Sequence, residues 1–278
     1  MLEIKFDLRE FESVEIVPIA DVHIGNPLCN EAAFKELVDY VLEEPDDPKC
    51  ARICLLNGDL TESPTKTNRN SSVFDMCMTP SVQVATMINY LKPLTVKTDK
   101  YPKGKILSYC SGNHDQDRYK ETGISAAESI AVGLELEDRF STNGCYSFIC
   151  LKRLNNGGGR SFTLYNQHMT GGGSTIGGKA NRVSKISQGV IADVIIGSHV
   201  HTPLTFKEDV IIPMTLKNQL QQVTVTHVIT NAFLRYGDYS QKMGLKPASI
   251  SVPRIYMWQR RVQTKGHRAH RRYIEVIL

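Results

Sequence analysis

The chain has 278 residues, of which 41% are apolar and 22% are charged, a balance typical of a soluble globular protein with a sizeable core. No apolar run reaches the roughly 18–20 residues that a membrane span needs. The first ten residues alternate charged with apolar side chains and lack the apolar core of a signal peptide. We therefore expect an intracellular, cytoplasmic protein with no membrane partner.

The net charge of +4 is unevenly distributed along the chain. Residues 254–272 contain seven Arg or Lys residues and no acidic residue, so the remainder carries −3. Such a stretch could meet the phosphates of a nucleic acid. A solvated edge strand with its turn explains it equally well.

Cysteine usage argues against a disulfide or zinc framework. The seven cysteines are odd in number and form no Cys-x-x-Cys pair. Cys54, Cys110 and Cys150 lie within or at the end of apolar runs, which indicates buried free thiols.

The first half of the chain alternates strands with helices. Apolar runs predict strands at residues 14–20, 51–57 and 106–110. Helices are predicted at residues 31–42 with Asn30 as N-cap, at 81–91, after 113 and at 124–132 with Gly133 as the stop, and residues 61–72 read as a surface loop. This alternation indicates a parallel sheet covered by helices.

The second half is richer in short strands. Strands are predicted at residues 145–151, 160–165, 194–196, 223–229 and 274–278, with a glycine-rich hairpin at 155–159 and a polar helix at 180–187. No linker or repeat divides the chain. We therefore expect one α/β domain over residues 1–278, built on two sheets.

Five polar blocks each follow an apolar run. They are Asp21-x-His23, Gly58-Asp59-x-x-Glu62, Gly112-Asn113-His114-Asp115, His168 and His199-x-His201. Each block alone has an ordinary explanation, such as a turn, a helix cap or a satisfied histidine. Five of the eight histidines lie in these blocks, however, and independent residues would have no reason to gather at strand ends.

Asp, Asn and His side chains all bind divalent cations. Seven such residues, without counting His114, are too many for one tetrahedral site and suit two metals that share a bridging carboxylate. Two such ions about 3.5–4 Å apart activate a water and neutralise a phosphoryl group. Residues i and i+2 of an extended segment share one side, so each paired block can reach the same metal cluster.

These motifs resemble the calcineurin-like metallophosphoesterase superfamily, whose pattern runs Asp-x-His, Gly-Asp-x-x-Asp/Glu, Gly-Asn-His-Asp/Glu, His and Gly-His-x-His. The resemblance covers residues 14–201 and implies an α/β sandwich with αββα layers. Gly197-Ser198 precedes His199 where the family has Gly directly before His, which moves the glycine and leaves the ligands in place. The segment from His168 to Arg182 also resembles members encoded by bacteria and their phages.

The resemblance implies a role for each polar residue. One metal would bind Asp21, His23, Asp59 and His201; the other would bind Asp59, Asn113, His168 and His199. His114 would contact the phosphate or protonate the leaving oxygen. Glu62 would orient His114, with Asp115 as the competing orienter.

The predicted activity is metal-dependent hydrolysis of a phosphoric ester. Family members that act on phosphoproteins carry arginines after the second motif and before Gly-Asn-His, and this chain lacks both. The resemblance therefore favours a phosphodiesterase that acts on a nucleotide or a nucleic acid. Nucleases belong to this class of enzyme. The alternatives are a phosphomonoesterase and a scaffold without catalysis. For the two divalent ions we expect Mn²⁺, with Fe or Zn²⁺ as alternatives.

Overall fold

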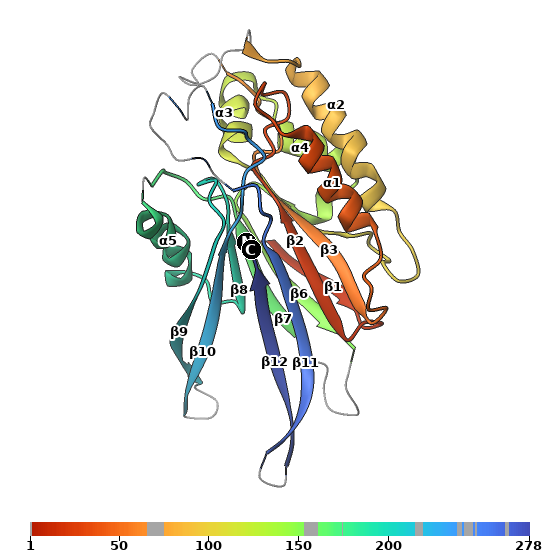
Figure 1. The fold of residues 1–278 in the computed structure, drawn as a ribbon, viewed down its shortest axis with the longest axis vertical. Coiled ribbons are helices and arrows are strands. Elements are labelled where there is room, and N and C mark those ends of the chain that lie inside the picture. Colours follow the sequence, from red (N-terminus) through yellow and green to blue (C-terminus); the bar gives the residue numbers. More distant parts are fainter. Residues whose placement is uncertain are drawn as a thin grey trace.

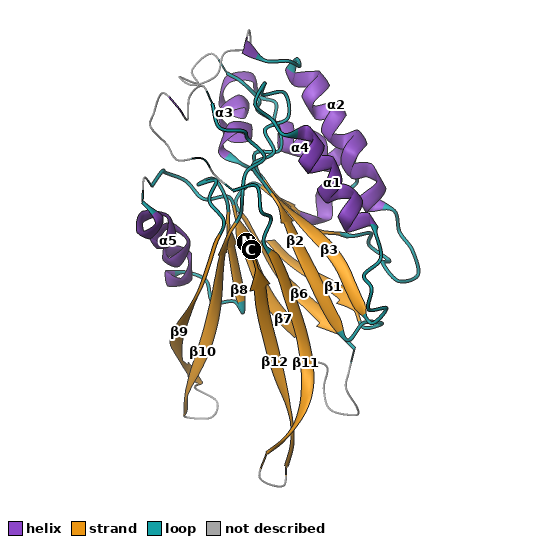
Figure 2. Ribbon diagram, in the orientation of Figure 1, coloured by secondary structure: helices purple, strands orange, loops and turns teal. Residues whose placement is uncertain are grey.

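In the described part of the chain, two six-stranded sheets pack face to face with helices on both outer sides (Figure 1 and Figure 2). This computed structural model describes residues 2–65, 75–152, 161–173, 175–214, 219–237, 241, 247, 249–264 and 267–278, the side chains of 261–264 and 267–270 excepted. The first sheet has the order β1 (Leu2–Leu8), β6 (Gly144–Leu151), β7 (Ser161–Gln167), β8 (Val194–Gly197), β10 (Gln219–Ile229) and β9 (Leu204–Met214). The second has the order β12 (His267–Ile277), β11 (Arg254–Thr264), β2 (Ser13–Ile19), β3 (Cys50–Asn57), β4 (Ile106–Cys110) and β5 (Phe140–Ser141).

Helices cover both outer faces of this sandwich. The second sheet carries α1 (Glu31–Leu42), α2 (Pro80–Leu91) and α4 (Ala126–Gly133), which bury their apolar faces on it. α5 (Ile176–Ser184) packs on the first sheet, and α3 (Asn113–Thr122) directly follows β4. The predicted α/β sandwich with αββα layers is thus confirmed. No described helix is long and apolar enough to cross a membrane.

The core between the sheets explains why the central strands read as continuous apolar runs. Ile16 and Ile53 from the second sheet pack in one cluster with Phe162 and Ile196 from the first. β3 is buried at every position because helices cover one of its faces and the first sheet covers the other.

Parallel pairing determines where the polar blocks lie. β2, β3 and β4 are parallel neighbours in the second sheet, and β7 and β8 are parallel neighbours in the first. The carboxyl ends of parallel neighbours meet at one edge of a sheet. In α/β sheets this edge is where ligands bind.

Several strands escaped the sequence prediction. β1 pairs in parallel with β6, and its strict alternation of buried and exposed residues is a strand signal that we overlooked. β9 was also missed, because charged residues at 207–209 and Pro213 are typical of an edge strand and hide its pattern. β11 and β12 form an antiparallel hairpin, in which β12 is the sheet edge and β11 lies between β12 and β2. The edge-strand interpretation of residues 254–272 therefore holds for the β12 part alone.

Helix boundaries show smaller errors. Asn30 caps α1 as predicted, by accepting from the Ala33 backbone N–H. Gly133 is the last residue of α4 rather than the residue after it. α5 begins four residues before the predicted start at 180 and gives way to a 3-10 turn, Lys185–Gln188. The predicted hairpin at residues 155–159 and most of the predicted loop at 61–72 lie outside the described residues.

Candidate metal centre

The predicted site residues gather where β2, β3 and β4 of the second sheet and β7 and β8 of the first reach their carboxyl ends. Asp21 and His23 follow β2, Asp59 and Glu62 follow β3, Asn113 and His114 begin α3 after β4, His168 follows β7, and His199 and His201 follow β8. The structure places eight of them in three groups of three whose donor atoms lie within 4.8 Å of one another. His23, Glu62 and His114 form one such group, at the ends of strands of the second sheet. The other two groups draw on both sheets, and we refer to them as the first and second groups.

The backbone at these residues is unusual. Asp21, His23, Asp59, His199 and His201 all have positive φ angles, between 50° and 84°. Ser63 and Glu135 are the other non-glycine residues with this conformation in the described part of the chain. Left-handed backbone at a side-chain-bearing residue costs about 1–3 kcal/mol and concentrates at functional sites. The paired blocks are therefore not the extended segments that we expected.

The first group comprises Asp21, His23 and His201. His201 Nε2 lies 3.3 Å from Asp21 Oδ1, and the rings of His23 and His201 are 5.3 Å apart. Asp21 Oδ1 and His23 Nε2 are buried, and neither forms a hydrogen bond with any described residue. Buried polar atoms without partners are rare in proteins, and here two of them share one spot with a third donor.

Glu62 lies behind the first group. His23 Nδ1 donates to Glu62 Oε2 at 2.9 Å, and Asn26 Nδ2 donates to the same oxygen at 3.1 Å. This contact leaves the lone pair of His23 Nε2 facing the group, as second-shell carboxylates do for metal-binding histidines. We had expected the Glu62 carboxylate to orient His114 instead. The Glu62 carboxylate is nearer to His23, at 2.9 Å, than to His114, whose Nδ1 lies 3.8 Å from Glu62 Oε1.

Replacing Glu62 by glutamine should weaken metal binding more than protein stability. The amide keeps the size of the side chain but removes the charge that fixes the His23 ring, and losing such a partner typically costs about 10–100-fold in metal affinity. Titration calorimetry with Mn²⁺ would measure the effect. Glu44→Gln, at a partly exposed carboxylate outside this centre, serves as the control; equal affinity for the two variants would contradict the role assigned to Glu62.

The second group comprises Asp59, His168 and His199. His168 Nε2 lies 3.1 Å from Asp59 Oδ2, and the rings of His168 and His199 are 5.3 Å apart. The two groups touch, because the His199 backbone N–H donates to Asp21 Oδ2 at 3.0 Å.

The side-chain amide of Asn113 closes the second group. One of its terminal atoms lies 2.9 Å from Asp59 Oδ2, 3.0 Å from His168 Nε2 and 2.7 Å from His199 Nδ1. An amide NH₂ at that position has two hydrogens and could donate to only two of these three atoms at once. An amide oxygen there would complete a set of four donors around a cation, which is the arrangement the sequence predicted for this metal.

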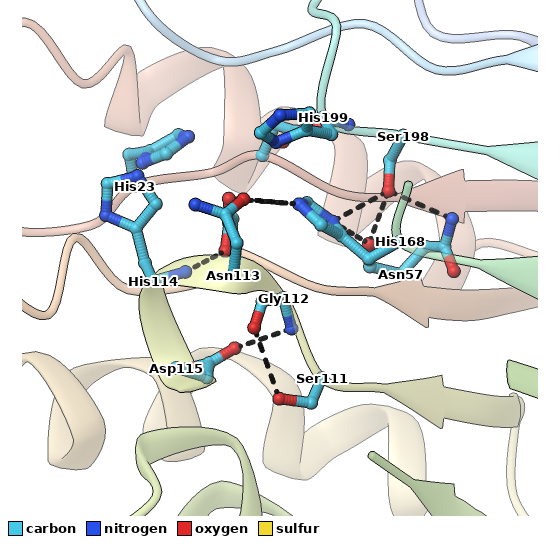
Figure 3. A network of polar contacts seen from close by, with 12 residues as sticks. His23, Asn57, Ser111, Gly112, Asn113, His114, Asp115, His168, Ser198 and His199 are labelled. Carbon is cyan, nitrogen blue, oxygen red and sulfur yellow. Dashed lines mark hydrogen bonds and ion pairs between the residues drawn. The ribbon is translucent and has the colours of Figure 1, made fainter. Parts of the chain in front are cut away.

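Two residues that sequence reasoning missed hold His168 in place. His168 Nδ1 lies 2.8 Å from the Asn57 carbonyl and 2.9 Å from Ser198 Oγ, and Ser198 Oγ donates to the same carbonyl at 2.6 Å (Figure 3). Because a carbonyl only accepts, Nδ1 carries a proton, and Nε2 is directed toward Asp59 and Asn113, where its lone pair would face a cation once the second proton is lost. The signal for Ser198 was its insertion between Gly197 and His199, which we had considered neutral.

His114 belongs to neither the first nor the second group, but it shares the remaining group with His23 and Glu62 and lies against the first. Its ring centroid is 4.9 Å from that of His23, and its backbone N–H donates to Asp59 Oδ1 at 3.0 Å. His114 Nδ1 lies 2.7 Å from the Glu62 backbone carbonyl. Glu62 therefore holds His114 through its main chain, and His114 Nε2 remains available to a substrate.

Asp115 does not orient His114. Its Oδ2 accepts from the Gly112 backbone N–H at 2.9 Å, so Asp115 caps the first turn of α3. Burial, followed by the charge of Asp59, raises the pKa of Asp115 to about 7. Asp115 thus stabilises the first turn of α3, which carries Asn113 and His114.

Charge within the second group favours deprotonated ligands at two of three positions. Burial alone would raise the pKa of Asp59, but the imidazoles of His168 and His114 outweigh it and hold that pKa well below its usual range. Burial, reinforced by His168, lowers the pKa of His199 to about 4. For His168, burial is outweighed by the Asp59 carboxylate, which raises the pKa to about 10. A cation bound here would displace that proton.

Two glycines let the loops after β3 and β4 touch. A Cβ on Gly112 would lie 2.0 Å from Asp59 Oδ1. Gly58, with φ of +84°, would bring a Cβ to 2.6 Å from His168 Nδ1 and 2.7 Å from Gly112 Cα. Neither position can take a larger residue without moving Asp59 or His168.

We expect Gly112→Ala to lower the free energy of unfolding by about 1–3 kcal/mol, the usual cost of overpacking. Urea denaturation in EDTA measures this without contribution from metal. Gly177→Ala is the matched control, because a Cβ at this helical position meets no atom within 4 Å. It should leave stability unchanged or raise it by up to about 1 kcal/mol. Equal stabilities of the two variants would refute the close contact at Gly112.

The residues present fit a pair of divalent cations. Each group offers carboxylate and imidazole donors, two buried donor atoms of the first group lack partners, and an amide completes the second group. Carbonyl or carboxylate partners fix the outer nitrogens of His23 and His168, as at known metal sites.

Comparisons with known proteins add little. No family model matches the chain, and no curated protein matches it. The crystal structure of a conserved uncharacterized protein from Streptococcus pneumoniae TIGR4, a predicted phosphoesterase, aligns at 10% identity with a TM-score of 0.37. Vacuolar Protein Sorting 29 from Cryptosporidium parvum aligns at 11% identity with a TM-score of 0.36. Each alignment covers 95% of this chain and 98% of the other. At such low similarity neither assigns the chain to a family, and the single domain and cytoplasmic location stay predictions.

Proposed function

We propose that this protein is a metal-dependent phosphoesterase that hydrolyses a phosphodiester through a metal-activated water. The observation that supports this most strongly is the pairing of two three-donor groups with an imidazole, that of His114, which lies beside them and outside both. Two cations held in this way would activate a water and neutralise the charge that develops on a phosphoryl group.

In this proposal, residues from different loops hold different cations. Asp21, His23 and His201 would hold one cation, and Asn113, His168 and His199 would hold the other. Asp59 would bridge them, as the resemblance implies: its Oδ2 faces the second group, and its Oδ1 accepts from the His114 backbone N–H beside the first. Left-handed backbone at five of these residues keeps the donor atoms converged before any ion binds.

His114 is the proposed general acid. Its Nδ1 is committed to the Glu62 carbonyl, so the ring cannot turn away from the cluster and Nε2 can give its proton to the leaving oxygen. Burial alone would lower the pKa of His114, but Asp59 and Glu62 outweigh it and raise that pKa above 6.5, which favours the proton-donating form.

The preference for diesters rests on the resemblance. The chain has Ser63 at the end of its second motif and Ser111 before Gly112, where the phosphoprotein phosphatases of the resembled family carry arginines. We propose Mn²⁺ as the working metal, with Fe and Zn²⁺ as the alternatives, since mixed carboxylate, amide and imidazole ligands suit all three.

Two measurements test the proposal together. Protein stripped with EDTA and reconstituted with Mn²⁺ should bind about two equivalents of metal, and should cleave bis-p-nitrophenyl phosphate faster than p-nitrophenyl phosphate. Faster cleavage of the monoester would make it a phosphatase. Metal content far below two equivalents, with no turnover of either ester, would overturn the enzyme assignment in favour of a scaffold.

A further inference from the structure

The hairpin of β11 and β12 carries a basic surface far from the metal centre. Along β11, Trp258 pairs with Ser13 at the start of β2, whereas Asp21 follows the end of β2. Eight residues of strand separate them, or roughly 26 Å at about 3.3 Å per residue. Beyond Trp258 the hairpin continues past the sheet, away from the helices (Figure 1).

One rung of this hairpin sets two positive charges directly opposite each other. Arg260 pairs with Arg271 across the strands, and both side chains are exposed. Neither forms an ion pair with any described residue. Arg272, by contrast, faces the other way and is paired with Asp193 at 2.8 Å. Like charges opposite each other destabilise a strand pair, so this rung is a cost to the free protein that a bound anion would remove.

The neighbouring rung on the same face is aromatic. Trp258 pairs with Tyr273, and their half-buried rings stack with centroids 5.5 Å apart and planes 10° apart. Side chains two residues apart on a strand share a face, so the arginine rung and the aromatic rung form one surface. We call Trp258, Arg260, Arg271 and Tyr273 the arginine–aromatic face.

We propose that the arginine–aromatic face binds single-stranded nucleic acid. Arginines pair with phosphates and aromatic rings stack on unpaired bases, the combination that sequence-tolerant single-strand binders use. The charge of the surrounding stretch agrees, because residues 254–272 carry seven basic residues and no acidic one. An acidic peptide would use the charges but leave the stacked rings without a role. This inference does not depend on the proposed catalytic function.

The single tryptophan makes the face directly observable. Trp258 is the only tryptophan of the chain, so its fluorescence reports on this surface alone. In EDTA, which prevents metal-dependent cleavage, a labelled 20-nucleotide single strand should gain anisotropy on titration with the full chain. The same titration with unlabelled strand should quench Trp258.

Arg260→Glu/Arg271→Glu should weaken binding about tenfold or more and abolish the quench. Losing two phosphate contacts should also flatten the slope of log affinity against log salt by about 1.4. The control Lys5→Glu/Lys97→Glu makes the same change in net charge at exposed residues on other surfaces, and should stay within about twofold of the parent chain. Arg260→Gln/Arg271→Gln separates folding from binding: it should weaken binding while its melting temperature at low salt equals or exceeds that of the parent.

Four results would overturn the proposal. The first is no anisotropy change at low salt. The second is equal weakening by the two charge-reversed variants, which would mean that net charge alone attracts the strand. The third is binding without a change in Trp258 fluorescence, which would place the bound strand elsewhere. The fourth is equal binding of polyglutamate or anionic phosphatidylserine vesicles, which would assign the face to another partner.

Discussion

Asp59→Asn is expected to lose both metals and, with them, nearly all turnover. Asp59 is fully buried, its Oδ2 faces His168, and its pKa is held well below the usual range. The substitution keeps the shape but removes the carboxylate charge of the second group, which in the proposal is shared with the first. The loss in metal affinity should exceed the roughly 10–100-fold that removal of an outer hydrogen-bond partner costs. Inductively coupled plasma mass spectrometry after dialysis against Mn²⁺ measures the bound metal.

Asp99→Asn is the control for this experiment. It makes the same chemical change at an exposed carboxylate in a loop away from the site, and should retain both metals. Retention of about two equivalents by Asp59→Asn would contradict the bridging role. Circular dichroism in EDTA checks that the variant is folded, so that lost metal is not mistaken for lost structure.

His114→Ala is expected to keep both metals and lose about 10²–10⁴-fold in turnover, the usual contribution of a general acid. His114 lies outside both donor groups, so its removal leaves the cluster intact. The remaining groups would still bind the phosphate, but the leaving oxygen would depart without a proton.

The leaving group provides the decisive comparison. p-Nitrophenolate departs readily without protonation, whereas an alkoxide does not. The deficit of His114→Ala should therefore be small with bis-p-nitrophenyl phosphate and large with a dinucleotide, whose leaving group is an alkoxide. Equal deficits across these substrates would show that His114 acts by charge or position rather than as an acid.

The buried parts of the fold were the predictable parts. Strands such as β3 lie between two layers, so burial on both faces leaves a continuous apolar run in the sequence. The parts that the sequence did not predict well lie at the sheet edges, which are formed by β9 and β12. Charged residues interrupt the apolar pattern of these strands, and β9 also contains Pro213. Edge strands avoid aggregation by interrupting their apolar pattern, and this removes the signal on which prediction depends.

The membership of the candidate site was predictable, but its internal contacts were not. Residue types and strand-end positions placed every predicted ligand at one edge. The sequence could not show that the Glu62 carboxylate binds His23 while the Glu62 backbone carbonyl binds His114. A residue's identity says nothing about the partner of its backbone carbonyl. Ser198 was missed because a hydroxyl that supports an imidazole resembles an ordinary strand-end polar residue. Asn57 was missed because it contacts His168 through its backbone carbonyl, a group that every residue has.

The origin of the donors from both sheets has a consequence for folding. Asp21 and His201, like Asp59 and His168, come from opposite layers of the sandwich, so each cation would fasten one layer to the other. Free metal at 100 times the dissociation constant would add about 2.7 kcal/mol per site to the stability of the closed sandwich. Each group also needs a histidine that follows β8, and the contact between His199 and Asp21 spans 178 residues of chain. A nascent chain that ends before β8 would therefore lack one donor of each group. Metal uptake would then require that β8 has joined the first sheet.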